Sequence, residues 1–249
     1  MHIKIFIILI ATASIVSCGK DKTTPTPLVN VPKVKTETNL TSGLSYNYTY
    51  DSQGRVIKVT KPSTNYEEYV YTPTLATFAE YSAAGVLQYR KYYELNSQGL
   101  AIKLTYDDPI YLTTYTYNSD KQPLKTTNYQ NGVITGTTDY YYTNKLLDSA
   151  VNKSPNNLNS TTYAYEYYDN IENTFSEKNF GRLNWGELSS KAIKKFSLKD
   201  YIAGVFYPNT YYTISYVYEL DAQNRISKTT STLVRTSGTT VNSSLVTYY

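Results

Sequence analysis

The sequence feature that most constrains the fold is a short unit that recurs around a tight turn. Four copies align on the Asp or Asn that opens the turn, namely Asp51, Asn96, Asn118 and Asp221. A Tyr precedes each opener by three positions (Tyr48, Tyr93, Tyr115 and Tyr218), and a Lys follows it by seven (Lys58, Lys103, Lys125 and Lys228). A turn residue between alternating aromatic segments is typical of a β-hairpin. Each unit therefore predicts two antiparallel strands.

The turn residues favour a bulged hairpin loop. An Asp or Asn caps such a turn with its side chain, and the residue three positions on must accept a left-handed conformation. Gly54, Gly99 and Asn224 fill that slot, whereas Lys121 fills it in one copy, so we expect that turn to differ. The bulged form places Asp51 opposite Arg55 and Tyr48 opposite Lys58 on one face. Another loop type would shift this register.

Composition also favours strands. The chain of 249 residues has 30 Tyr against 6 Phe and 1 Trp, and Tyr is a strand former with an apolar body and a polar tip. Further alternating segments, such as Tyr163–Tyr167, add to the four units. We predict an all-β fold, an antiparallel β-meander of about a dozen strands in repeated hairpins. These form a curved or rolled sheet, open and barrel-like.

One insert, residues 169–200, loses the alternation. Its apolar residues are spread among basic ones, and residues 185–196 are expected to form a short helix over an end or a face of the sheet. Trp185 in this insert, together with Tyr48, Tyr93, Tyr115 and Tyr218, is a candidate binding surface. We favour the interpretation that this insert plugs the core over the interpretation that it forms a ligand site.

The N-terminus carries an export signal. A basic start and an apolar run from Ile5 to Val16 precede Ser17 and Cys18, and the run is shorter than the roughly 20 residues that span a bilayer. Ile15-Val16-Ser17-Cys18 resembles a lipobox, which implies lipidation of Cys18 and cleavage before it. Cys18 is the only Cys, so no disulfide is expected. The resemblance to a lipobox implies an outer-membrane lipoprotein of a Gram-negative bacterium, periplasmic or surface-facing, because Asp, the usual inner-membrane retention residue, is absent directly after Cys18.

The chain then divides into three parts. We expect a signal peptide at 1–17, a lipidated Cys and flexible Thr/Pro/Lys tether at 18–40, and a single repeat-built β domain at 41–249. The net charge of +4 is too weak to imply nucleic acid as a partner. The expected partners are the membrane, through the Cys18 lipid, and a protein or glycan.

The aligned pattern Tyr-x-Tyr-x-x-Asp-x-x-Gly-Arg-x-x-Lys resembles the tyrosine–aspartate repeats of bacterial surface and toxin-shell proteins. With the lipobox and the Trp- and Lys-containing insert, the chain is similar to an uncharacterised family of Gram-negative lipoproteins. That resemblance implies a domain of unknown function with a porin-like, rolled antiparallel sheet, and it implies no catalytic residues. Leu100 and Gln122, in place of the Arg after the turn, depart from the pattern.

Several chemistries are excluded by residue content. His2, the only His, leaves with the signal, which removes imidazole-based catalysis and metal sites. We expect no cofactor and no metal. Glu67 and Glu68 are neighbours on a strand and point to opposite faces, so their carboxylates cannot act together on one sugar. Asp107-Asp108-Pro109 is predicted to form a turn.

Two functions remain. The favoured one is a non-enzymatic, lipid-anchored envelope protein that acts as a scaffold or binds protein or glycan on its Tyr-covered sheet. The alternative is a carboxylate-dependent glycan hydrolase, for which two carboxylates about 5–9.5 Å apart in a pocket are required. The plainer alternative for the Tyr rows is that they merely cover a thin sheet.

Overall fold

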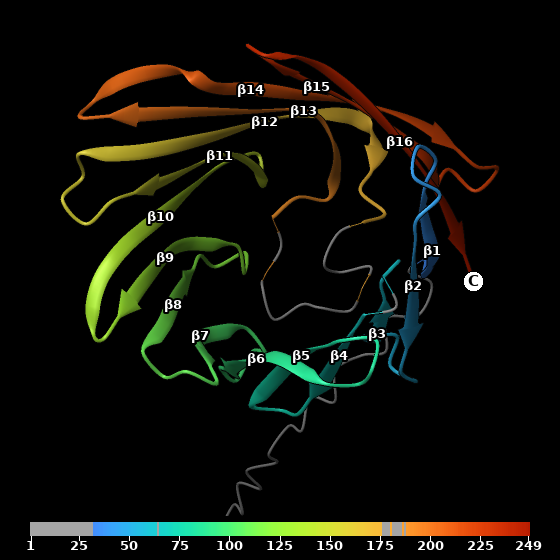
Figure 1. The fold of residues 1–249 in the computed structure, drawn as a ribbon, viewed down its shortest axis with the longest axis horizontal. Helices are drawn as coiled ribbons and strands as arrows, with labels where there is room; N and C mark the ends of the chain where they lie inside the picture. The colour runs from blue at the N-terminus through green and yellow to red at the C-terminus, as the bar shows by residue number, and fades with distance from the viewer. Residues whose placement is uncertain (1–31, 64, 176–179, 181–185, 187) are drawn as a thin grey trace, which may run out of the picture.

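The computed structural model describes residues 32–63, 65–175, 180, 186 and 188–249. They form a closed antiparallel barrel of sixteen strands, each paired with its neighbours in sequence (Figure 1). The ring closes where β1 pairs with β16, from Val34 opposite Tyr248 to Asn39 opposite Ser244. The predicted all-β antiparallel meander is confirmed. The expected open sheet of about a dozen strands is wrong, because the first and last strands hydrogen-bond to each other.

The strands are β1 Val34–Asn39, β2 Ser45–Tyr50, β3 Val56–Thr60, β4 Tyr66–Tyr71, β5 Leu75–Tyr81, β6 Leu87–Leu95, β7 Ala101–Tyr106, β8 Tyr111–Tyr117, β9 Pro123–Gln130, β10 Val133–Thr143, β11 Leu146–Lys153, β12 Asn159–Glu172, β13 Lys191–Ile202, β14 Val205–Leu220, β15 Ile226–Arg235 and β16 Gly238–Tyr248. Strand β1 lies within the stretch assigned to the tether. The barrel therefore includes residues from Val34 onward, not only from residue 41, and the Val34 side chain is fully buried. The signal segment 1–17 and Cys18 lie outside the described residues.

The helix expected at 185–196 is wrong for the part that the structure describes. Residues from Lys191 onward belong to β13, which pairs with both β12 and β14. The register between β12 and β13 shifts between Tyr167, opposite Ile193, and Glu166, opposite Lys195. That one-residue bulge breaks the alternation of apolar and polar residues, so the start of the strand could not be recognised in the sequence. Trp185 lies outside the described residues.

The insert packs against the inside of the barrel at the points that are described. Phe180 is 5% exposed, belongs to the hydrophobic core and stacks on Tyr48 with ring centroids 5.1 Å apart. Its carbonyl accepts a hydrogen bond of 2.8 Å from the Val56 amide on β3. Farther along, the Leu188 carbonyl accepts one of 3.2 Å from the Leu147 amide on β11. The interpretation of this segment as a plug is confirmed at Phe180.

The four repeat turns share one geometry. In the first copy the Asp51 amide donates to the Arg55 carbonyl, the Gly54 amide donates to the Asp51 carbonyl, and Gly54 has φ +74°. The copy with Lys121 in the same slot has φ +63° there and the matching hydrogen bond. Our expectation that this turn would differ is wrong, because Lys121 accepts the left-handed conformation.

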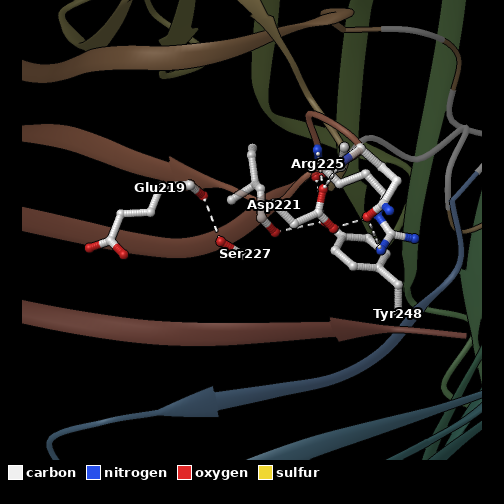
Figure 2. Close-up of polar contacts among 8 residues, drawn as sticks. Glu219, Asp221, Arg225, Ser227 and Tyr248 are labelled. Carbon is white, nitrogen blue, oxygen red and sulfur yellow. Dashed lines mark hydrogen bonds and ion pairs between the residues drawn. The ribbon is translucent and has the colours of Figure 1, made fainter.

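Two of the turns carry an additional clamp. The Asp51 carboxylate receives the Arg55 guanidinium at 2.7 Å, and Asp221 receives that of Arg225 at 2.7 Å. The Arg225 guanidinium also lies 4.3 Å from the centre of the Tyr248 ring (Figure 2). Aspartate, arginine and tyrosine thus hold the turn to the next strands.

The predicted pairing of the repeat Tyr with the repeat Lys is wrong. Asp51 lies beside Arg55 as expected, but a second bulge at Ile57 moves the register by one residue. Lys58 then pairs with Thr49, and Tyr48 pairs with Val59. The same shift occurs in the other three copies. Because a shift of one residue exchanges the faces of a strand, the repeat tyrosines point into the barrel and the repeat lysines point outward.

The bulges also explain the many tyrosine hydroxyls inside. A bulge leaves a backbone carbonyl outside the strand ladder, and such a carbonyl needs another partner. Tyr hydroxyls from the following strand donate to carbonyls beside the bulges at 2.8 or 2.9 Å: Tyr50 to Val34, Tyr71 to Val56, Tyr117 to Ala101, Tyr167 to Leu147, Tyr218 to Ile193 and Tyr248 to Ile226. We call these bonds the tyrosine ties. They link the strands at one end of the barrel.

The barrel has two different ends. The turns that follow even-numbered strands, including the four repeat turns, lie together at what we call the repeat end. The turns that follow odd-numbered strands lie together at the opposite end, which we call the rim. The core residues Val56, Ala101 and Ile226 begin their strands at the repeat end, and each is at most 1% exposed. The chain both enters and leaves the barrel there, since the Tyr249 amide donates to the Lys33 carbonyl.

Candidate functional site: the tyrosine wall of the barrel lumen

The two faces of the barrel wall have opposite character. The outer face carries ion pairs between neighbouring strands, among them Lys58 with Glu68 at 3.4 Å and Lys125 with Asp139 at 3.9 Å. The inner face carries most of the tyrosines. Strands β1–β7 fill their share of the lumen with a packed core around Val59 and Phe78. The aromatic residues of β10 to β14 face the remaining part.

Six aromatic side chains on these strands define what we call the luminal tyrosine wall: Tyr140, Tyr163, Tyr165, Phe196, Tyr212 and Tyr216. All six are half-buried. Phe196 lies at the centre, with ring centroids 5.4 Å from Tyr165, 5.9 Å from Tyr212 and 6.0 Å from Tyr163. The strand register produces this arrangement, because Phe196 pairs with Tyr165 on one side and Ile214 on the other. The ring contacts around Phe196 thus form a continuous aromatic surface across β12, β13 and β14, and Tyr140 on β10 faces the same lumen.

Four of the wall hydroxyls, those of Tyr140, Tyr163, Tyr165 and Tyr216, stay protonated at neutral pH. Burial raises the pKa of Tyr163, Tyr165 and Tyr216 above the ordinary phenol value, and neighbouring tyrosines act in the same direction. Burial likewise raises the pKa of Tyr140, against a hydrogen bond with Thr126 that lowers it. Each neutral phenol can both donate and accept a hydrogen bond. Flat rings edged with such hydroxyls suit a ligand that has apolar faces and many polar edges.

Polar side chains flank the wall on the rim side. Thr161 donates to the Asp200 carboxylate at 2.5 Å, and the Arg235 guanidinium lies 5.4 Å from the centre of the Tyr212 ring. Across the lumen, Thr113 donates to Asn128 at 2.8 Å. The lumen therefore combines aromatic faces with groups that can hydrogen-bond a polar ligand.

The four tyrosines of the predicted surface lie on the inner face but do not form one open surface, and Trp185 lies outside the described residues. Tyr93 is 6% exposed within the core, and Tyr48 and Tyr115 pack against that core. Tyr218 lies apart from them, next to Tyr216 with stacked rings 6.3 Å apart. Tyr218 therefore adjoins the luminal tyrosine wall. The wall residues were missed because alternation along β12 and β14 does not reveal which face turns inward.

A cluster of charges, also missed in the sequence, lies in the lumen near the rim. The Lys61 ammonium contacts Glu67 at 2.9 Å and Glu80 at 2.8 Å. The hydrogen bond from Lys61 outweighs partial burial and lowers the pKa of Glu80. An ionised Glu80 is unsuited to act as a general acid in glycoside hydrolysis. The expected separation of Glu67 and Glu68 is confirmed, since Glu68 binds Lys58 on the outer face.

Other expectations about chemistry can be placed in the structure. Asp107-Asp108-Pro109 forms the turn between β7 and β8, as predicted, and the Asp108 carboxylate accepts a hydrogen bond from the Ile110 amide. Among the described residues, no group of three or more His, Cys, Asp or Glu is placed to hold a metal ion. Cys18 and Trp185 lie outside the described residues.

Comparison with solved structures identifies the same architecture elsewhere. A porin-like protein from Bacteroides uniformis matches with a TM-score of 0.62 and 15% identity, over 87% of this chain and 96% of that one. A porin-like protein from Bacteroides vulgatus matches with a TM-score of 0.50 and 13% identity, over 88% of this chain and 99% of that one. They share this fold. No protein-family model and no curated protein matches the chain.

Proposed function

We propose that this chain is a non-enzymatic protein of the Gram-negative cell envelope that is anchored through a lipid on Cys18 and binds a glycan in its lumen. The observation that carries the glycan part is the luminal tyrosine wall. Sugars have apolar faces that stack on aromatic rings and hydroxyl edges that need hydrogen bonds. The half-buried rings around Phe196, with Asp200 and Arg235 on the rim side, supply both.

The envelope location is supported by two observations. The solved barrels with this fold come from Bacteroides and are porin-like proteins. The sequence Ile15-Val16-Ser17-Cys18 resembles a lipobox. Among the described residues, no helix has the length and apolar character needed to cross a membrane.

The outer wall supports a barrel that stands in water on its tether. Lipid-facing strands carry apolar residues outward in a band about 25 Å tall. Here the outward positions hold Lys103 with Glu94 at 4.0 Å and Lys195 with Glu166 at 3.6 Å. Charged pairs on that face would lose their hydration in a bilayer. The lipid on Cys18 then provides the membrane attachment.

Glycan binding is tested with purified mature protein and a panel of neutral and acidic oligosaccharides, read by titration calorimetry. Tyr140 and Tyr141 are adjacent on β10, one in the luminal wall and the other 47% exposed on the outer face. We expect Tyr140→Leu to weaken binding about tenfold, the value of one stacked ring. Tyr141→Leu should leave it unchanged. Absence of binding to every oligosaccharide, or equal losses in both variants, would overturn the glycan proposal.

The anchor is tested separately. Cells that express the chain are labelled with radioactive palmitate, and the protein is isolated. We expect label in the wild type and none in Cys18→Ala. An unlabelled wild-type protein contradicts the lipid anchor without bearing on the lumen.

A further inference from the structure

The rim of the barrel is a ring of exposed apolar side chains. Seven of the eight hairpins at this end carry at least one: Leu40 and Leu44, Val86, Tyr111, Val133 and Ile134, Leu158, Ile202 with Val205 and Phe206, and Val234. Val205 and Val133 are the most open of these, at 70% and 66% exposed. Contiguous exposed apolar groups mark an interaction surface, and Ile202, Val205 and Phe206 lie together on one hairpin of this rim.

The turns at the two ends differ in charge. Most rim turns are built from uncharged residues, such as 41–43, 83–85, 131–132, 155–157, 203–204 and 236–237. Lys61 in one rim turn is bonded to Glu67 and Glu80 in the lumen. Asp107 and Asp108 in another rim turn are exposed, and each accepts a hydrogen bond, from the Tyr92 hydroxyl and the Ile110 amide respectively. At the repeat end, by contrast, ion pairs hold the turns of Asp51 and Asp221. Apart from the turn of Asp107 and Asp108, the rim turns can leave water without stripping ions of their hydration.

The hairpin between β13 and β14 is the most apolar part of the rim. Its aromatic rings form a chain, with Tyr201 5.9 Å from Phe206 and Phe206 6.1 Å from Tyr211. Tyrosine, with an apolar ring and a polar hydroxyl, is favoured where hydrocarbon meets lipid headgroups. Ile202 and Val205 lie at the tip of the same hairpin, 52% and 70% exposed. The side chains thus change from aliphatic at the tip to aromatic behind it.

We propose that the rim docks on a lipid surface, with the hairpin tips inserted among the headgroups. The apolar residues are divided among seven separate hairpins around a closed ring. A deformable, uncharged hydrocarbon boundary can accept all of these tips at once, whereas a protein partner would need a separate pocket for each. Most hairpin tips and that boundary are both uncharged, which favours lipid as the occupant of the rim.

The described chain enters the barrel at the end opposite the rim. The Lys33 side chain lies against Gly54 in a repeat turn, one residue before β1 begins at Val34. The expected tether from Cys18 to Lys33 would reach some tens of ångströms at about 3.1 Å per residue. That reach lets a barrel anchored at Cys18 turn its rim toward the same membrane. Docking at the rim and anchoring at Cys18 are then compatible.

The test uses the mature chain with Cys18→Ala, so that no lipid anchor contributes. The barrel closes through β1 and β16, downstream of this position. Binding to vesicles of phosphatidylethanolamine and phosphatidylglycerol is measured by flotation. We expect the protein with an unchanged rim to float with the vesicles. Val205→Asp and Val133→Asp should each reduce vesicle binding about tenfold or more.

Matched controls come from the outer wall. Val217 lies on the same strand as Val205 and is 61% exposed, and Val70 on β4 is 60% exposed. Val217→Asp and Val70→Asp should bind vesicles as the wild type does, and circular dichroism should report an intact barrel in all variants. Failure of the wild type to float, or equal losses in rim and wall variants, overturns the proposal. The proposal is also overturned if sedimentation shows that the wild type self-associates and that Val205→Asp abolishes this, because the occupant of the rim would then be a second copy.

Discussion

Two tyrosines near the repeat end of the barrel should respond in opposite ways to loss of the hydroxyl. The Tyr218 hydroxyl donates to the Ile193 carbonyl at 2.8 Å, beside a bulge. Tyr142 lies opposite Leu147 directly after a bulge, just as the tie residue Tyr117 lies opposite Pro123. The buried hydroxyl of Tyr142, however, has no hydrogen-bond partner within the described part of the chain. The variants Tyr218→Phe and Tyr142→Phe each remove one oxygen and leave the ring.

The magnitudes follow from what each oxygen does. Tyr218→Phe leaves a buried carbonyl unpaired and should lower the free energy of unfolding by about 1–1.5 kcal/mol. For a domain of this size that is a fall in Tm of roughly 2–6 °C. Tyr142→Phe removes a hydroxyl that is buried without a partner, so stability should stay within about 0.5 kcal/mol or increase.

Urea unfolding followed by circular dichroism measures both variants against the wild type at pH 7. Equal m-values would show that the unfolded states are comparable. Equal destabilisation by both substitutions, or no effect of Tyr218→Phe, would refute the assignment of the tyrosine ties as a stabilising device.

Three further predictions concern the turns, the core and the insert. Desolvation raises the pKa of Asp221, but hydrogen bonds from Arg225 outweigh it and hold this pKa below its ordinary value. The carboxylate's contribution to the free energy of unfolding should therefore be complete above about pH 4 and lost as pH falls through the folded pKa. Asp221→Asn should weaken that acid dependence in urea titrations from about pH 6 to 2. Ile226 is 1% exposed, so Ile226→Ala should lower the free energy of unfolding in urea by about 2–5 kcal/mol. Val217→Ala on the outer wall should change it by no more than about 0.5 kcal/mol. Similar losses in both variants would contradict the assignment of Ile226 to the inner face. Gly186 has φ +76° and would place a Cβ against a backbone carbonyl, so Gly186→Ala should lower Tm by several degrees, and an unchanged Tm would show that the insert does not hold this contact.

Much of the local structure could be predicted from residue spacing. The turn openers, the left-handed Gly54 and Gly99, and the clamp of Asp51 on Arg55 depend on neighbouring residues alone. So does the separation of Glu67 from Glu68, because it follows from alternation along a strand. These features required no knowledge of distant parts of the chain.

The candidate site could not be predicted in the same way. The luminal tyrosine wall joins β12, β13 and β14, and Phe196 meets Tyr165 only through their register. The start of β13 resembled a helix because a bulge near Ile193 interrupts its alternation. Residues 191–196 form a strand since their hydrogen-bond partners lie on neighbouring strands, not within the segment itself.

The sequence by itself determined that this chain would form antiparallel hairpins, and where most of the repeat turns would lie. Only the tertiary structure decided which face of those hairpins is inside and that the ring closes. A bulge at Ile57, repeated at the corresponding place in the other copies, moves Lys58 outward and leaves Tyr48 inside. Each bulge also bends its strand, and the bends add up around the ring until β1 meets β16. That sum depends on all sixteen strands together, so no single repeat contains it.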